Sequence, residues 1–209
     1  MLGAIRDKWA ALGYEQSYLA YPTTDEFDCS GGRCSTFQNG TILKSTTDGT
    51  VQDQPEMLTY DTDITFSDST PVGGHGTLAL YSDGTVHFSG HMHDSGFPSY
   101  QYSVVMGTYA CIKCDGSDTD VYEAPNQGSM AGTIDSGSRD DFWDKAAVRD
   151  EVRQHWSEIR SGASSMGYFW KVNTSSDWLA LLNSVAAEVA KIYKLFEGSG
   201  GSGGSGSGG

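Results

Sequence analysis

The stretch 75-HGTLALYSDGTVHFSGHMHD-94 decides the fold, because it holds two runs of alternating apolar and polar residues around a single turn. A three-residue loop, 82-SDG-84, with glycine in the left-handed position, puts the apolar side chains of both runs on one face of a β-hairpin. They are Leu78, Leu80, Val86 and Phe88. A two-residue loop would mix the faces, so the sequence predicts the three-residue loop.

The opposite face of this hairpin is rich in histidine. It carries His75, His87, His91 and His93, four of the five histidines in the chain. In the predicted register His75 lies across from His91, where Cβ atoms are ~5 Å apart, and His93 follows His91 at ~7 Å. Three imidazoles that converge in this way are the ligand set of a zinc site with one open position. His75, His91 and His93 are therefore the candidate metal ligands, with zinc as the possible cofactor, whereas the favoured interpretation is a polar face that holds no cofactor.

Two other interpretations of the histidine face stay open. Its rings can simply form hydrogen bonds with neighbouring Ser, Thr and Asp side chains, or they can act as a proton-linked switch. Asp94 follows His93 and is expected to point to the other face, where it cannot orient that ring for catalysis. Outside the Gly/Ser tail, no Gly-x-Ser-x-Gly motif is present. These observations favour a protein that is not an enzyme, with a metal-dependent hydrolase centred on the histidines as the alternative.

The middle of the chain, residues 55–135, reads as β-structure throughout. Five strand-like runs are separated by Gly, Pro, Asp and Ser, which is typical of an antiparallel β-sandwich or barrel. The runs are 57–68, 76–82, 85–94, 99–111 and 119–124.

Residues 136–197 show helical spacing instead. One apolar stripe consists of Val148, Val152, Trp156 and Ile159, and a longer one runs from Trp178 to Phe196. We expect a C-terminal helical hairpin that packs on the β-domain or docks on a partner protein. The acidic group Asp140, Asp141 and Asp144 is then expected to mark the N-terminus of the first helix, with a carboxylate site as the alternative. The last residues, 198-GSGGSGGSGSGG-209, form an engineered linker.

The first 54 residues predict a small α+β module. Ile5, Trp9 and Leu12 share one face of a helix that Gly13 ends. Two strand-like runs, 34–38 and 41–46, meet at Asn39-Gly40, which is a strong hairpin signal.

A spaced set of residues in this module resembles an LGFP repeat, found in secreted and wall-associated proteins of actinobacteria. The set is Ile5, Lys8-Trp9, Leu12-Gly13, Leu19-Ala20-Tyr21-Pro22-Thr23, Glu26, Phe37, Gly40, Ile42 and Gly49. The name-giving Leu-Gly-Phe-Pro reads Leu-Ala-Tyr-Pro here, and the segment 28-DCSGGRC-34 adds two cysteines. The resemblance implies attachment to the cell envelope and recognition of its glycan.

A second, weaker resemblance concerns the segment 90-GHMHDSGFPSY-100, which is similar to a β-region of uncharacterised secreted actinobacterial proteins and implies no activity. Glycan binding needs aromatic faces and polar side chains. The candidates are Trp9, Tyr21, Tyr81 and His87. The leading hypothesis is thus a secreted, envelope-associated binding protein that recognises cell-wall glycan.

Charge and cysteine content restrict partners and compartment. The chain has 27 acidic and 13 basic residues, a net charge of −14, and no basic run that could neutralise phosphates. Nucleic acid and anionic membranes are therefore poor partners, and no apolar stretch reaches the ~20 residues of a membrane-spanning helix. The four cysteines form two local pairs, Cys29/Cys34 and Cys111/Cys114, which predict two short-range disulfides and an extracytoplasmic location. A zinc site built from both pairs is the alternative.

Overall fold

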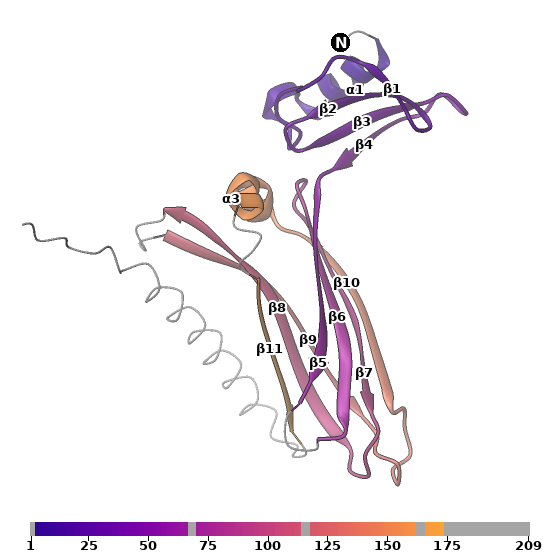
Figure 1. Ribbon diagram of the computed structural model, residues 1–209, viewed down its shortest axis with the longest axis vertical. Helices are drawn as coiled ribbons and strands as arrows, with labels where there is room; N and C mark the ends of the chain where they lie inside the picture. Colours follow the sequence, from indigo (N-terminus) through magenta and orange to yellow (C-terminus); the bar gives the residue numbers. More distant parts are fainter. Residues whose placement is uncertain (1–2, 67–69, 114–117, 162–165, 174–209) are drawn as a thin grey trace, which may run out of the picture. The chain divides into compact units, whose positions relative to one another are not determined.

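The computed structural model of the protein describes residues 3–66, 70–113, 118–161 and 166–173. At residues 105, 108–113, 118–125 and 166–173 the description is limited to the backbone. Antiparallel sheets dominate these parts of the chain, and the helices within them are short (Figure 1). The predicted β-rich α+β class is therefore confirmed.

The N-terminal part begins with the helix α1 (Ala4–Leu12) and the 3-10 turn η1 (Tyr14–Gln16). A four-stranded antiparallel sheet follows, in which the strands are ordered as in the sequence. They are β1 (Phe27–Cys29), β2 (Gly32–Phe37), β3 (Gly40–Ser45) and β4 (Val51–Pro55). The helix ends at Gly13 in the left-handed conformation, as predicted.

A small apolar core and a disulfide hold this part together. The core consists of Ile5, Leu19, Phe37 and Ile42. Cys29 and Cys34 are bonded, with their Cα atoms 5.9 Å apart, which confirms one of the two predicted disulfides and excludes zinc ligation by this pair. The Cys111–Cys114 prediction lies outside the described side chains.

The predicted hairpin is present as β6 (Val72–Tyr81) and β7 (Thr85–Asp94), joined by residues 82–84. Gly84 takes a φ of 94°, and its N–H donates to the carbonyl of Tyr81 at 2.9 Å. The four apolar side chains predicted to point inward are all buried, whereas the histidines are half-buried or exposed. The three-residue loop and the two faces are therefore confirmed.

Two sheets form the rest of the described β-structure. The first has the strand order β10-β7-β6-β5, with β5 (Met57–Thr65) and β10 (Asp140–Val148) at its edges. The second has the order β11-β8-β9, built from β8 (Tyr100–Lys113), β9 (Asp118–Met130) and β11 (Met166–Asn173). Tyr102 of β8 packs against Trp143 of β10, with ring centroids 6.0 Å apart, so side chains of both sheets share one core.

The prediction of helix from residue 139 onward is wrong for two segments, β10 and β11. In β10, Trp143 is buried against Phe88 and Tyr102, and this packing overrides the local helix preference of Lys145-Ala146-Ala147. In β11, every residue pairs with β8, from Met166 opposite Thr108 to Asn173 opposite Gln101.

Helix does follow β10, as α2 (Asp150–Gln154) and α3 (Trp156–Ser161). Three residues of the predicted first stripe, Val152, Trp156 and Ile159, are buried there, whereas Val148 is exposed on β10. The predicted stripe from Trp178 to Phe196 and the Gly/Ser linker lie outside the described residues. Within the described residues, no helix is long and apolar enough to cross a membrane.

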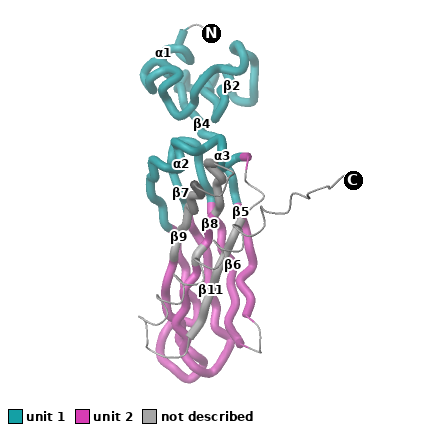
Figure 2. The backbone as a smooth tube through the Cα atoms, turned by 90° about the vertical axis from the view of Figure 1, so that its left-hand side faces the viewer, with its two compact units in different colours: residues 1–59, 79–87, 145–160 teal, residues 60–78, 88–144, 161–209 magenta. Residues whose placement is uncertain are grey.

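The chain divides into two compact units, coloured separately in Figure 2. Unit 1 comprises residues 1–59, 79–87 and 145–160, and unit 2 comprises residues 60–78, 88–144 and 161–209. The predicted division into 1–54, 55–135 and 136–197 follows the order of the sequence. The two units interleave along the chain, and β5, β6, β7 and β10 each contribute residues to both.

Candidate metal centre

Alternation along the end of β7 sets the direction of each side chain. Met92 and Asp94 are fully buried. His91 and His93 alternate with them along the strand and point outward. The Oδ1 atom of Asp94 accepts a hydrogen bond from the N–H of Gly96 at 2.7 Å. As expected from the sequence, Asp94 is on the opposite face from His93 and does not orient its ring.

The carboxylate beside the two histidines comes from β10. This strand is the neighbour of β7 in the sheet, and its first residue is Asp140. Arg139 fixes the start of the pairing, because its carbonyl accepts the N–H of Asp94 at 2.9 Å and its Nε donates to the carbonyl of Asp94 at 2.8 Å. Asp140 therefore lies on the same outer face as His91 and His93.

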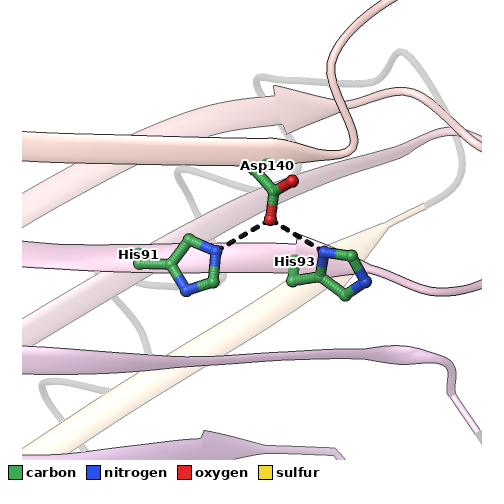
Figure 3. A group of neighbouring side chains, drawn as sticks. All are labelled: His91, His93 and Asp140. Carbon is green, nitrogen blue, oxygen red and sulfur yellow. Dashed lines mark hydrogen bonds and ion pairs between the residues drawn. The ribbon is translucent and has the colours of Figure 1, made fainter.

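One oxygen of Asp140 contacts both rings (Figure 3). Its Oδ1 is 2.9 Å from Nε2 of His91 and 2.8 Å from Nδ1 of His93. A carboxylate can only accept, so both nitrogens carry hydrogen in this arrangement. The hydrogen bond from His91, which has the larger effect, and the hydrogen bond from His93 lower the pKa of Asp140 below its ordinary value. The three atoms lie within 4.8 Å of one another, which is a geometry that could hold a metal ion.

Packing on the inner face supports this arrangement. Trp143 is buried, three residues after Asp140, and a Cβ atom on Gly90 would lie 2.2 Å from Cζ2 of its ring. Glycine at position 90 thus lets the indole lie close against β7. On the outer face, Phe142 stacks on His91 with ring centroids 4.5 Å apart and remains 72% exposed. β10 is therefore held on β7 from both faces.

The third predicted ligand, His75, is not part of this cluster. Its Nδ1 is 3.0 Å from Oδ1 of Asp63, and its Nε2 is 3.5 Å from Oγ1 of Thr77 and 3.7 Å from Asp61. Asp61 and Asp63 belong to β5, which pairs with β6 on the side away from β7. The carboxylates of β5 thus hold His75, and Asp140 takes its place as the third candidate ligand.

All three histidines nevertheless line one open depression of about 520 Å³. Residues 70–75 provide one side of it, and His91, His93 and Ser95 provide the other. The depression therefore adjoins the cluster, and the rings of His91 and His93 belong to both.

The predicted glycan-binding residues lie elsewhere. Trp9 is half-buried, its ring edge-on to Tyr14 at 5.0 Å, and its Nε1 donates to the carbonyl of Ala20 at 3.2 Å. Tyr21 is 59% exposed. Tyr81 and His87 are half-buried at the β6–β7 turn end of the hairpin.

Comparison with models of known protein families and with curated proteins gives no match. The residue that sequence reasoning missed is Asp140. It is 47 residues after His93, and its strand was predicted as a helix. No local pattern marks this strand, because Trp143 is its only buried residue.

Proposed function

We propose that the protein binds a divalent transition-metal ion through His91, His93 and Asp140. The convergence of two imidazole nitrogens and one carboxylate oxygen carries this proposal. Two imidazoles and a carboxylate suit zinc and neighbouring first-row ions, whereas calcium and magnesium take oxygen ligands. Ligand atoms around tetrahedral zinc are roughly 3.3 Å apart, and the three ligand atoms here lie within 4.8 Å of one another, so metal binding requires an adjustment of the two rings and the carboxylate.

Metal loading also changes where the ring protons reside. Nε2 of His91 and Nδ1 of His93 donate to Asp140 in the metal-free protein. A metal needs the lone pairs of these same nitrogens, so each neutral ring moves its hydrogen to the other nitrogen. A protonated ring must release a proton, and acid therefore weakens binding.

Calorimetric titration of tag-free protein with zinc chloride tests the proposal. We expect the wild type to bind one zinc ion per chain and His93→Gln to bind at least about tenfold more weakly, because a ligand is lost. His155→Gln makes the same chemical change outside the cluster and should leave the affinity within about twofold. Equal affinities in all three proteins, or no saturable binding by the wild type, would contradict the proposal.

Asp94 does not supply the acid–base group that hydrolysis at this centre would require. Hydrolysis requires an acid–base group close to the metal-bound water. The carboxylate next to His93 in the chain, Asp94, is buried on the opposite face. The alternative of a C-terminal helix that docks on a partner concerns residues outside those described.

A second proposal concerns the N-terminal module, which we infer to attach the protein to cell-envelope glycan. Trp9 donates a hydrogen bond to the carbonyl of Ala20, which has a φ of 59° and directly precedes the exposed Tyr21. Trp9 acts here as a support for the turn, and Tyr21 offers the free aromatic face. Glycan recognition and a secreted location follow from the LGFP resemblance rather than from this geometry.

Sedimentation with purified actinobacterial cell walls tests the attachment. We expect the wild type to be retained and Tyr21→Ala to lose most of the retained fraction, since stacking on an aromatic face is removed. Phe27→Ala removes another partly exposed aromatic side chain of the same module and serves as the control. Failure of the wild type to sediment with the walls would refute the attachment.

A further inference from the structure

Two loops at one end of unit 2 expose large apolar side chains. Residues 95–99 join β7 to β8, and residues 131–139 join β9 to β10, at the end of the sheet where β7 finishes and β10 begins (Figure 1). Phe97 in the first loop is 70% exposed. Ile134 in the second is 76% exposed, the highest value among the large apolar side chains that the structure describes. We call Phe97 and Ile134 the apolar tip.

Hydrogen bonds join the two loops to each other. Thr133 donates to the carbonyl of Gly96 through its N–H at 2.9 Å and through its Oγ1 at 2.6 Å. The hydroxyl of Ser99 accepts the N–H of Gly132 at 3.1 Å and donates to Oδ2 of Asp135 at 2.5 Å. Residues adjacent in sequence to both members of the apolar tip are therefore bonded together, and these polar groups are satisfied within the loops.

Close packing also orders the loops. Oδ1 of the fully buried Asp94 accepts the N–H of Gly96 at 2.7 Å. A Cβ atom on Gly132 would lie 1.9 Å from the carbonyl oxygen of Phe97, and one on Gly96 would lie 2.3 Å from Cγ of Pro71. Glycine is thus the residue that permits both approaches. The apolar tip projects from an ordered framework, so binding through it requires little further ordering of the loops.

The loops that carry the apolar tip are nearly uncharged, although the protein has a net charge of −14. Residues 95–99 and 131–138 contain a single charged residue, Asp135, whose carboxylate accepts a hydrogen bond within the loops. The next residue, Arg139, donates through its Nε to the carbonyl of Asp94. Loops without a free cationic side chain do not attract anionic lipid, whereas an uncharged apolar tip suits a surface of zwitterionic lipid.

The area of the apolar tip is small for a protein partner. Two side chains of this size expose on the order of 300 Å². A specific protein interface buries about 800 Å² on each partner, so a second copy of the chain or another protein would need further contacts. A lipid interface accepts an apolar side chain without a complementary shape, and the area buried sets the strength of binding. Backbone groups that approach lipid must be hydrogen-bonded, as several in these loops are.

We propose that the apolar tip binds the interface of a zwitterionic lipid bilayer, with Phe97 and Ile134 inserted among the head groups. The binding is weak and reversible, because only two side chains enter the lipid. Neither the metal cluster nor the N-terminal module takes part. This inference therefore goes beyond both proposed functions and is independent of them.

Sedimentation with sucrose-filled phosphatidylcholine vesicles, at millimolar lipid and in EDTA, tests the proposal. We expect the wild type to be retained and Phe97→Ser/Ile134→Ser to partition at least about tenfold more weakly, because its apolar area at the tip is lost. Met57→Ser/Val148→Ser removes two other exposed apolar side chains, 52% and 73% exposed, and should stay within about twofold of the wild type. Thermal melting verifies that each variant is folded.

A gain-of-signal variant keeps the test independent of any loss of folding. Tryptophan favours the membrane interface, so Phe97→Trp should partition at least as strongly as the wild type. Its additional fluorescence should shift to shorter wavelength when vesicles are added. Addition of phosphatidylserine to the vesicles should not increase retention of the wild type, because the net charge of −14 opposes approach to an anionic surface.

Four results would overturn the proposal. The first is a wild type that does not sediment with phosphatidylcholine vesicles. The second is equal retention of the wild type and the Phe97→Ser/Ile134→Ser variant, or an equal loss in the control variant. The third is retention that requires phosphatidylserine and disappears in high salt, which indicates electrostatic binding. The fourth is a dimer of the wild type that the Phe97→Ser/Ile134→Ser variant cannot form, which assigns the apolar tip to a second copy of the chain.

Discussion

Asp140 is the residue on which the candidate centre depends. It is exposed, and a single oxygen accepts hydrogen bonds from two imidazoles. The carboxylate and both rings are on the outer face of one sheet, so solvent screens their interaction and each bond contributes modestly to stability. Its value is positional, because it holds both imidazole rings at the site, although the hydrogens that it accepts must move when a metal binds.

The lowered pKa of Asp140 predicts a pH-dependent contribution to stability in metal-free protein. A carboxyl group whose folded pKa is depressed stabilises the fold above its unfolded pKa, ~3.9, and loses this effect as pH falls through the folded value. Relative to Asp140→Asn, the wild type should therefore be more stable at pH 5, and the difference should shrink as pH falls below ~3.9 and through the lowered folded pKa. Urea unfolding in EDTA across this range measures it.

A double-mutant cycle assigns the effect to the histidines. In a His91→Gln/His93→Gln background, the two donors that lower the pKa of Asp140 are absent. Adding Asp140→Asn there should leave the pH dependence almost unchanged. The same pH-dependent difference in both backgrounds would show that another group is responsible.

At the scale of elements, β7 and β10 build the centre through a close approach at Gly90. A Cβ atom at this position would lie 2.2 Å from the Trp143 ring and 2.5 Å from the carbonyl of His75. The glycine therefore serves two strand contacts at once. Gly90 also connects the close contact with buried Trp143 to His91, the next residue in the chain, which points outward.

Gly90→Ala should accordingly destabilise the protein by ~1–3 kcal/mol, the usual cost of overpacking a dense core. Because displaced Trp143 shifts β10 and with it Asp140, zinc affinity should fall as well. Thermal unfolding and zinc titration measure the two effects, with Ser89→Ala on the outer face of the same strand as control. Combining Gly90→Ala with Trp143→Phe should cost less than the sum of the single changes, and strict additivity would disprove the proposed clash.

The β6–β7 hairpin and the strand β10 differ in how well the sequence predicts them. The hairpin, its loop and both faces were predictable because Leu78, Leu80, Val86 and Phe88 alternate strictly around a glycine turn. β10 was not predictable, because Trp143 is the only buried residue along a strand that is otherwise mostly exposed. The histidine pair was thus found from local alternation alone. Its carboxylate partner depends on a strand pairing between distant segments, which local patterns do not encode.

At the scale of the whole molecule, the N-terminal sheet has its own apolar core and its own disulfide, as a region that folds independently would have. Its core residues Ile5, Leu19, Phe37 and Ile42 all precede residue 55, and the Cys29–Cys34 disulfide lies within the same segment. Unit 1 also includes residues 79–87 and 145–160, which contribute contacts such as the hydrogen bond from Trp156 to Glu56 at 2.9 Å.

We expect the fragment of residues 1–55 to unfold cooperatively but with low stability, since a domain of about 60 residues buries little surface. Circular dichroism during heating measures this, and reduction should lower the midpoint modestly because so short a disulfide loop contributes less than ~3 kcal/mol. Ile42→Ser in the fragment provides the unfolded reference. An oxidised fragment without a cooperative transition would show that the other segments of unit 1 are required.

The separation of 47 residues between His93 and Asp140 gives metal binding a topological role. An ion coordinated by both residues closes a loop that contains all of β8 and β9. In the denatured chain such a closure removes conformational entropy, in the manner of a cross-link, and the gain grows only slowly with loop length. The ion would then act as a reversible cross-link that closes the segment with β8 and β9, and a chelator would open it without breaking a covalent bond.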